Sequence, residues 1–88
     1  NNYTMEQIIQ NATERTEKIL VKIKQKREEK RYRREEIAEK LGIDLSTYTR
    51  IENGDSHLKV KTLFLIAQLL DIDIVALFTN NTTDSHFI

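Results

Sequence analysis

The chain has 88 residues, no cysteine, and 14 basic against 14 acidic side chains. This length allows one small domain whose core is only just large enough to fold alone, so a partner subunit would add useful stability. The lack of cysteine excludes disulfides and thiolate metal sites, and no stretch approaches the roughly 20 apolar residues of a membrane span. With no proline, two glycines and many strong helix formers, the composition predicts an all-α chain.

The first predicted helix is unusually long and runs from Met5 to about Arg31. Its apolar residues recur at alternating spacings of four and three, the pattern of a heptad seam. They are Met5, Ile9, Ala12, Thr16, Ile19 and Ile23. The part around Ile23 should cover the domain core, which leaves residues 1–17 as a helical extension. We expect its four seam residues, Met5, Ile9, Ala12 and Thr16, to pack on the same segment of another subunit; the alternatives are a frayed extension or a break near residues 11–13 that folds the helix back.

Basic residues are concentrated between residues 18 and 34. This stretch contains nine basic and two acidic side chains, a local net charge of +7 that the rest of the chain compensates. Attraction to phosphate acts within about a Debye length, ~8–10 Å, so a local basic surface matters more for nucleic-acid binding than the total charge. The alternative is an ordinary solvated helix face.

Two short helical patterns follow, hinged on Gly42. Glycine can adopt the left-handed conformation that ends a helix, so the first pattern stops there. Asp44 is a good N-cap for the second pattern, whose apolar face holds Tyr48 and Ile51. A three-residue hinge makes the helices cross steeply, and Ala38 is the small residue that allows a close approach. The sequence therefore predicts a helix-turn-helix.

The stretch from Arg34 to Gly54, REEIAEKLGIDLSTYTRIENG, resembles the helix-turn-helix of Cro and phage-repressor regulators. The family pattern is matched in register and without gaps at Glu35, Ile37, Ala38, Leu41, Gly42, Ile43, Ser46, Tyr48, Ile51, Glu52 and Gly54. Farther along, TLFLIAQLLDIDIVALF, from Thr62 to Phe78, is similar to the fourth and fifth helices of the same family. The resemblance implies a five-helix, all-α, repressor-like domain over residues 18–78. The heptad spacing makes the first helix longer than the family needs, and the polar, Thr- and Asn-rich composition of residues 79–88 predicts a flexible tail.

The resemblance also implies which side chains meet DNA. Base readout in the major groove is expected from Leu45, Ser46, Thr47, Thr49 and Arg50. Of these, Arg50 could bind guanine bidentately, whereas Leu45 can only touch a thymine methyl group or pack against something else. Phosphate contacts are expected from Arg33, Arg34, Asn53 and Lys59.

Two helix starts depart from the family pattern, because cations stand where a capping or polar residue is usual. These are Arg33 and Arg34 at the second helix and Lys59 at the fourth. We expect them to exchange an internal cap for charge directed at phosphate. By resemblance, Arg27 and Glu52 form a structural ion pair, since removing one would leave the other buried and unpaired at a cost of about 3–5 kcal/mol.

The remaining apolar residues are expected to complete the core. They are Val60, Leu63, Phe64, Ile66, Ala67, Leu69, Leu70, Ile72, Ile74, Val75, Leu77 and Phe78. His57 and His86 have no companion ligand at metal spacing, so no metal or other cofactor is predicted.

Nothing in the sequence indicates an enzyme, because it contains no nucleophile with a placed base, no metal cluster and no glycine-rich phosphate loop. The leading interpretation is a cytoplasmic transcription regulator, nucleoid-associated when bound, that binds double-stranded DNA as a homodimer. Its operator would be a palindrome with half-sites about 34 Å apart. The alternative is a protein-interaction module of the same fold, such as the antitoxin of a toxin–antitoxin pair, whose long first helix holds a protein partner. Dimers could form through the N-terminal helix or through the fifth helix.

Overall fold

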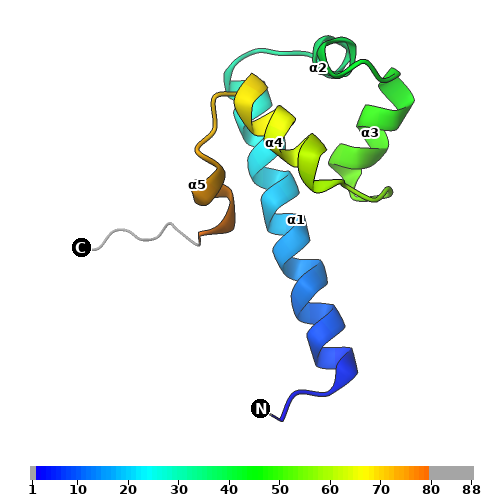
Figure 1. The fold of residues 1–88 in the computed structure, drawn as a ribbon, viewed down its shortest axis with the longest axis vertical. Coiled ribbons are helices and arrows are strands. Elements are labelled where there is room, and N and C mark those ends of the chain that lie inside the picture. Colours follow the sequence, from blue (N-terminus) through cyan, green and yellow to red (C-terminus); the bar gives the residue numbers. More distant parts are fainter. Residues whose placement is uncertain (1, 80–88) are drawn as a thin grey trace, which may run out of the picture.

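The computed structural model describes residues 2–79, and these form five helices with no strand among them (Figure 1). The helices are α1 (Met5–Glu29), α2 (Arg34–Leu41), α3 (Leu45–Asn53), α4 (Val60–Leu69) and α5 (Ile74–Phe78). The all-α, five-helix fold predicted from the sequence is confirmed. Within residues 2–79, no helix is both long enough and apolar enough to cross a membrane.

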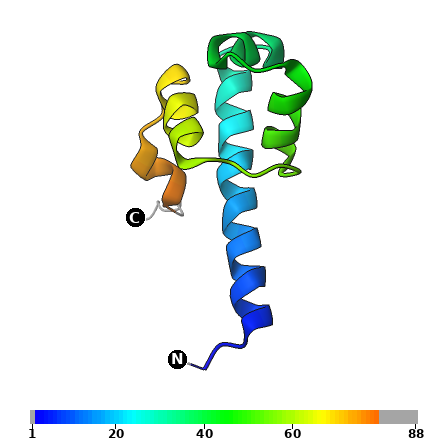
Figure 2. The same ribbon diagram turned by 45° about the vertical axis from the view of Figure 1, so that its right-hand side comes forward.

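Helix α1 is a single continuous helix of 25 residues. Thr4 and Gln7 form a capping box at its start: the Gln7 amide donates to Thr4 Oγ1 at 3.1 Å, and the Thr4 amide donates to Gln7 Oε1 at 2.9 Å. The chain leaves the other end through Arg31, which has a positive φ of 62°. Only the second half of α1 is surrounded by the other helices, and the first half projects beyond them (Figure 2).

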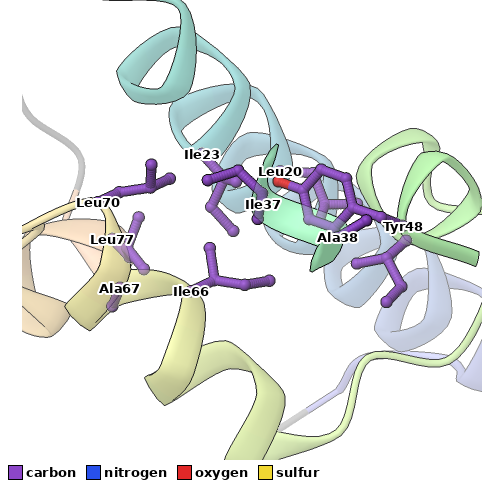
Figure 3. Close-up of a cluster of buried hydrophobic side chains, with 10 residues drawn as sticks. Leu20, Ile23, Ile37, Ala38, Tyr48, Ile66, Ala67, Leu70 and Leu77 are labelled. Atoms are coloured by element: carbon purple, nitrogen blue, oxygen red, sulfur yellow. The ribbon is translucent and has the colours of Figure 1, made fainter. Parts of the chain in front are cut away.

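The core lies where α1, α2, α3 and α4 meet, with α5 closing one side (Figure 3). Its largest fully buried side chains are Tyr48, Ile23, Ile37, Ile66 and Leu70. Burying a side chain of this kind contributes about 1.5–3 kcal/mol, so these five dominate the stability that a chain of this length can build. The N-terminal half of α1 adds nothing to this core.

The turn between α2 and α3 has the predicted chemistry. Gly42 adopts the left-handed conformation at φ 74°, and the Ile43 amide donates to the Ala38 carbonyl at 3.0 Å. Asp44 caps α3 by accepting from the Thr47 amide at 2.9 Å. Ala38 is buried at 2% exposure, where the two helices cross. A rigid turn therefore fixes how α3 is presented.

Four residues predicted for the core are on the surface instead: Val60, Phe64, Val75 and Phe78 are 69%, 49%, 61% and 63% exposed. The reason is geometric. Helix α4 is apolar on nearly all sides but has only one side against the core. Ile66 and Ala67 occupy that side, and the C-cap residue Leu70 is buried just after it. Helix α5 has five residues, and only its Leu77 is buried.

Candidate nucleic-acid interface

Helix α3 has one side buried against the domain and one side facing outward, and most residues of the outer side are polar. Tyr48, Ile51 and Glu52 are buried. The residues predicted for base readout lie outside that buried side: Leu45, Ser46 and Arg50 are exposed, and Thr47 and Thr49 are half-buried. The apolar side anchors the helix, and the polar side can enter a groove. Leu45 is the one large apolar residue on this outer side, with 43% of its surface exposed.

The three helix starts near this surface are capped differently. At α3, the Asp44 carboxylate takes the cap, and its hydrogen bonds with Thr47 hold its pKa below the ordinary value. A carboxylate there would repel phosphate, so the start of α3 suits base edges better than the backbone. At α2 and α4, the N-cap residues Arg33 and Lys59 supply no side-chain hydrogen bond to their helix. The start of α4 therefore presents a cation with no acidic residue in the first turn, whereas at α2 the cation stands beside Glu35 and Glu36.

The Arg33 side chain is 74% exposed, and its guanidinium Nε lies 3.8 Å from Glu36 Oε1 in an exposed ion pair. The Arg33 backbone amide donates to Glu36 Oε1 at 2.7 Å, so the helix is closed from within by a glutamate of its first turn. Lys59 and Asn53 are also exposed, at the two ends of the loop that joins α3 to α4 (Figure 1). The residues predicted for phosphate contacts thus stand at the start of α2, at the end of α3 and at the start of α4.

A buried cluster of polar side chains holds α3 against α1 and α2. Glu52 accepts from Arg27 Nε at 2.8 Å and from Arg27 Nη2 at 3.0 Å. It also accepts from the Tyr48 hydroxyl at 2.7 Å and from Arg34 Nε at 3.3 Å. Arg27 Nη1 reaches on to the Tyr32 carbonyl at 2.8 Å. The cluster ties α3 to two other helices through one carboxylate.

The charges in this cluster are mutually stabilised. Burial opposes ionisation of Glu52, but the hydrogen bonds from Arg27, Tyr48 and Arg34 outweigh it and lower the pKa of its carboxyl below the ordinary 4.5. Burial, with the hydrogen bond to Glu52, raises the pKa of the Tyr48 phenol. Glu52 is therefore ionised and Tyr48 neutral at physiological pH, the states in which their hydrogen bond forms.

Sequence reasoning missed the two additional donors in this cluster. The sequence predicts Tyr48 on the apolar face of its helix and Arg34 at a phosphate, and in the structure both side chains donate to Glu52. The signal for Tyr48 was its spacing, since residues four apart on a helix are neighbours. Arg34 retains 35% exposure of its side chain, so it borders both the cluster and the surface.

The four residues predicted for dimerisation lie far from this surface, on the projecting half of α1. Met5 and Ile9 are 68% and 56% exposed. Ala12 and Thr16 are exposed as well, and the Thr16 hydroxyl donates back to the Ala12 carbonyl at 2.8 Å. Helix α1 runs through residues 11–13 without a break.

No group of three or more His, Cys, Asp or Glu side chains that could hold a metal ion occurs among residues 2–79. His57 is exposed in the loop before α4. His86 lies outside the described residues, as does most of the tail predicted over residues 79–88.

A glycine-hinged pair of helices inside a five-helix fold defines a helix-turn-helix domain of the repressor type. A protein-family model described as helix-turn-helix matches residues 23–77, which is more than half of the chain. The chain belongs to this family of DNA-binding domains, of the Cro and phage-repressor type. The match begins at Ile23, so the projecting half of α1 is outside it. Comparison with curated proteins gave no match, and neither did comparison with solved structures.

Proposed function

We propose that this protein is a sequence-specific transcription regulator that binds a palindromic operator as a homodimer. The observation that carries the proposal is the outer side of α3, where Ser46 and Arg50 are exposed, while the buried Glu52 fixes the inner side; the helices before and after it, α2 and α4, have the cations Arg33 and Lys59 as N-cap residues. A helix presented in this way fits the major groove of duplex DNA. Such a regulator would act in the cytoplasm, on the nucleoid.

In this proposal the residues of α3 read bases. Arg50 is exposed and long enough to donate two hydrogen bonds to one guanine, a contact that discriminates by about 1–3 kcal/mol. Ser46, Thr47 and Thr49 supply hydroxyl groups, and Leu45 offers an apolar contact to a thymine methyl group. The operator should therefore carry guanine and thymine at the positions that α3 faces.

Backbone contacts come from the residues around α3. Arg33 and Lys59 act through their exposed charges at helix starts, and Asn53 through its side-chain amide. Arg34 has a divided role, because its guanidinium also donates to Glu52. If Arg34 binds a phosphate, the same guanidinium contacts both that phosphate and Glu52, the carboxylate that positions α3.

The experiment that tests the function is selection of bound sequences from random duplex DNA by the purified protein. The expected result is an enriched palindrome, which would report both sequence specificity and two-fold symmetry. Recovery of unenriched DNA, or binding that vanishes at moderate salt for every sequence, would contradict the proposal.

A second candidate function is a protein-interaction module of the same fold, such as an antitoxin. The exposed Leu45 on an otherwise polar surface favours it, since leucine there suits a protein partner as well as a base. The selection separates the two functions: an enriched operator supports the regulator, and absence of any DNA preference supports the interaction module.

A further inference from the structure

The first half of α1 carries an apolar stripe, made of Met5, Ile9, Ala12 and Thr16, that is exposed among the described residues 2–79. Ile8, beside it, is 47% exposed. Each helical residue turns about 100°, so the alternating spacings of four and three keep the stripe on one side of the helix. That is also the side of Ile23, which is 1% exposed in the core. The stripe is thus a direct continuation of the surface that α1 buries in its own domain.

We propose that a second copy of this chain covers the stripe, with the two α1 helices antiparallel. This pair of helices would be the interface of the homodimer in the proposed function. Only the biological role of the interface rests on that function. The fold itself excludes the parallel arrangement. From Leu20 onward, the side of α1 that bears the stripe is filled by its own domain, so a partner running in the same direction would collide with that domain. An antiparallel partner would run away from it, along the half of α1 that projects beyond the other helices (Figure 2).

Side-chain sizes along the stripe also favour the antiparallel pair. With the crossing point between residues 10 and 11, Met5 faces Thr16 of the second copy and Ile9 faces its Ala12. Each layer then combines one large and one small side chain, as close packing requires. In a parallel pair every residue would face its own counterpart, so Met5 and Ile9 would crowd while Ala12 and Thr16 left gaps.

Charge supports the same arrangement. Residues 5–16 contain two acidic side chains and one basic side chain, so two such segments repel each other little. The basic stretch begins at Lys18 and continues through the second half of α1. Antiparallel packing puts the two basic stretches at opposite ends of the dimer, whereas parallel packing would bring them together.

The antiparallel dimer also presents both recognition helices on one surface. Helices α3 and α5 lie on opposite sides of α1 in both views (Figures 1 and 2). On one side of α1, Arg27 donates hydrogen bonds to Glu52 of α3. On the other side, Lys22 donates to the carbonyl oxygens of Ala76, in α5, and Thr79, just after it. The two-fold axis of an antiparallel pair is perpendicular to the plane of the two helices, so it leaves both α3 helices on the same side.

The expected separation of the recognition helices suits DNA. On α1, the residues beside α3 extend from Leu20, next to Gly54, to Arg27. At 1.5 Å per residue they lie about 14 to 25 Å from the crossing point. The two α3 helices are therefore about 30–50 Å apart along α1, a range that includes the ~34 Å between half-sites one DNA turn apart.

The first test compares two matched substitutions by sedimentation equilibrium. Ile9→Lys puts a charge in the stripe, while Val21→Lys puts the same charge at a 53%-exposed position on roughly the opposite side of α1. We expect the wild-type chain and Val21→Lys to be dimers and Ile9→Lys a monomer, with helix content by circular dichroism unchanged in both variants. A monomeric wild type, or a dimeric Ile9→Lys, would overturn the proposal.

The second test establishes direction by cross-linking, since the chain has no cysteine of its own. A mixture of Met5→Cys and Thr16→Cys chains, one of them enlarged by a tag, should give the mixed disulfide on a non-reducing gel. Met5→Cys alone should not link to itself, because in the antiparallel pair its two copies lie about 16 Å apart along the helices, far beyond disulfide reach. Efficient self-linking of Met5→Cys would show a parallel pair instead. Repeating the mixture in an Arg50→Ala background separates this inference from DNA binding, because the cross-link should persist when base contacts are lost.

Discussion

Glu52 is the side chain through which α1, α2 and α3 are held together. It accepts hydrogen bonds from Arg27, Arg34 and Tyr48, one on each of these helices. Its side chain is 1% exposed, so its charge could not persist there without those donors. The position of α3 therefore depends on one ionised carboxyl group.

Replacing Glu52 by Gln should lower the free energy of unfolding by about 3 kcal/mol or more, because Arg27 loses its buried counter-charge. Urea denaturation followed by circular dichroism measures the change. Glu29→Gln is the matched control, since it breaks the exposed Lys26–Glu29 pair of 3.2 Å and should change stability by no more than about 0.5 kcal/mol. Equal effects of the two substitutions would contradict the role given to the buried cluster.

The same pair of proteins predicts a pH dependence. The pKa of Glu52 is lower in the folded chain than its ordinary 4.5, so its ionisation stabilises the fold above that value and the contribution is lost as pH falls through the folded pKa. The stability difference between wild type and Glu52→Gln should be constant at neutral pH and shrink below about pH 4.5. Denaturation curves at a series of pH values test this, and a difference that grew toward acid would have the wrong sign.

Arg50 is the residue on which base discrimination should depend most. Arg50→Ala is expected to weaken binding to the selected operator by about 10- to 100-fold, the equivalent of losing one bidentate guanine contact. Lys18→Ala is the control, because it removes the same charge from the side of α1 near α5. Fluorescence anisotropy with labelled operator measures both, and a similar loss in the two variants would reduce the Arg50 effect to general electrostatics.

Sequence and structure agree unevenly at the scale of single residues. The family resemblance paired Arg27 with Glu52 across 25 positions, and the structure contains that pair. It could not place the Tyr48 hydroxyl or the Arg34 guanidinium on the same carboxylate, because each of these side chains has another plausible partner. Only the packing of three helices decides between the partners.

At the scale of elements, the starts of α2 and α4 are the features that distinguish this chain from its family's usual pattern. Lys59→Ala should reduce the slope of log affinity against log salt concentration by about one, because one phosphate contact is lost. Stability should hardly change, since Lys59 supplies no side-chain cap. Binding titrations at four or five salt concentrations test this, and an unchanged slope would remove Lys59 from the interface.

Helix positions could be predicted where local chemistry fixes them. Gly42 and Asp44 set the end of α2 and the start of α3 within one short turn, and no distant contact is needed for that. The orientation of α4 could not be predicted, because a helix that is apolar on nearly all sides gives no signal for which side is buried. For that reason the sequence predicts Val60 and Phe64 in the core, whereas the structure has both exposed.

For the whole molecule, the projecting half of α1 should determine how tightly a palindrome is bound. Ile9→Lys leaves α3 intact, so its affinity for a single half-site should equal that of wild type. On the complete palindrome, wild type should bind at least tenfold more tightly than Ile9→Lys, because the second domain then binds at a high effective concentration. Mobility-shift titrations on both duplexes measure this, and equal affinities on the palindrome would argue against cooperation between subunits.

The unbroken course of α1 limits how such a dimer could adapt to its target. Between Thr16 and the buried Leu20 there is no hinge, since both belong to one 25-residue helix that also enters the core. A dimer joined through such a rigid helix holds its two α3 helices at one fixed distance. One extra base pair in the operator's spacer turns the second half-site by about 35° around the duplex axis. A single insertion should therefore prevent the dimer from binding both half-sites at once. A dimer with flexible linkers would accommodate the same insertion.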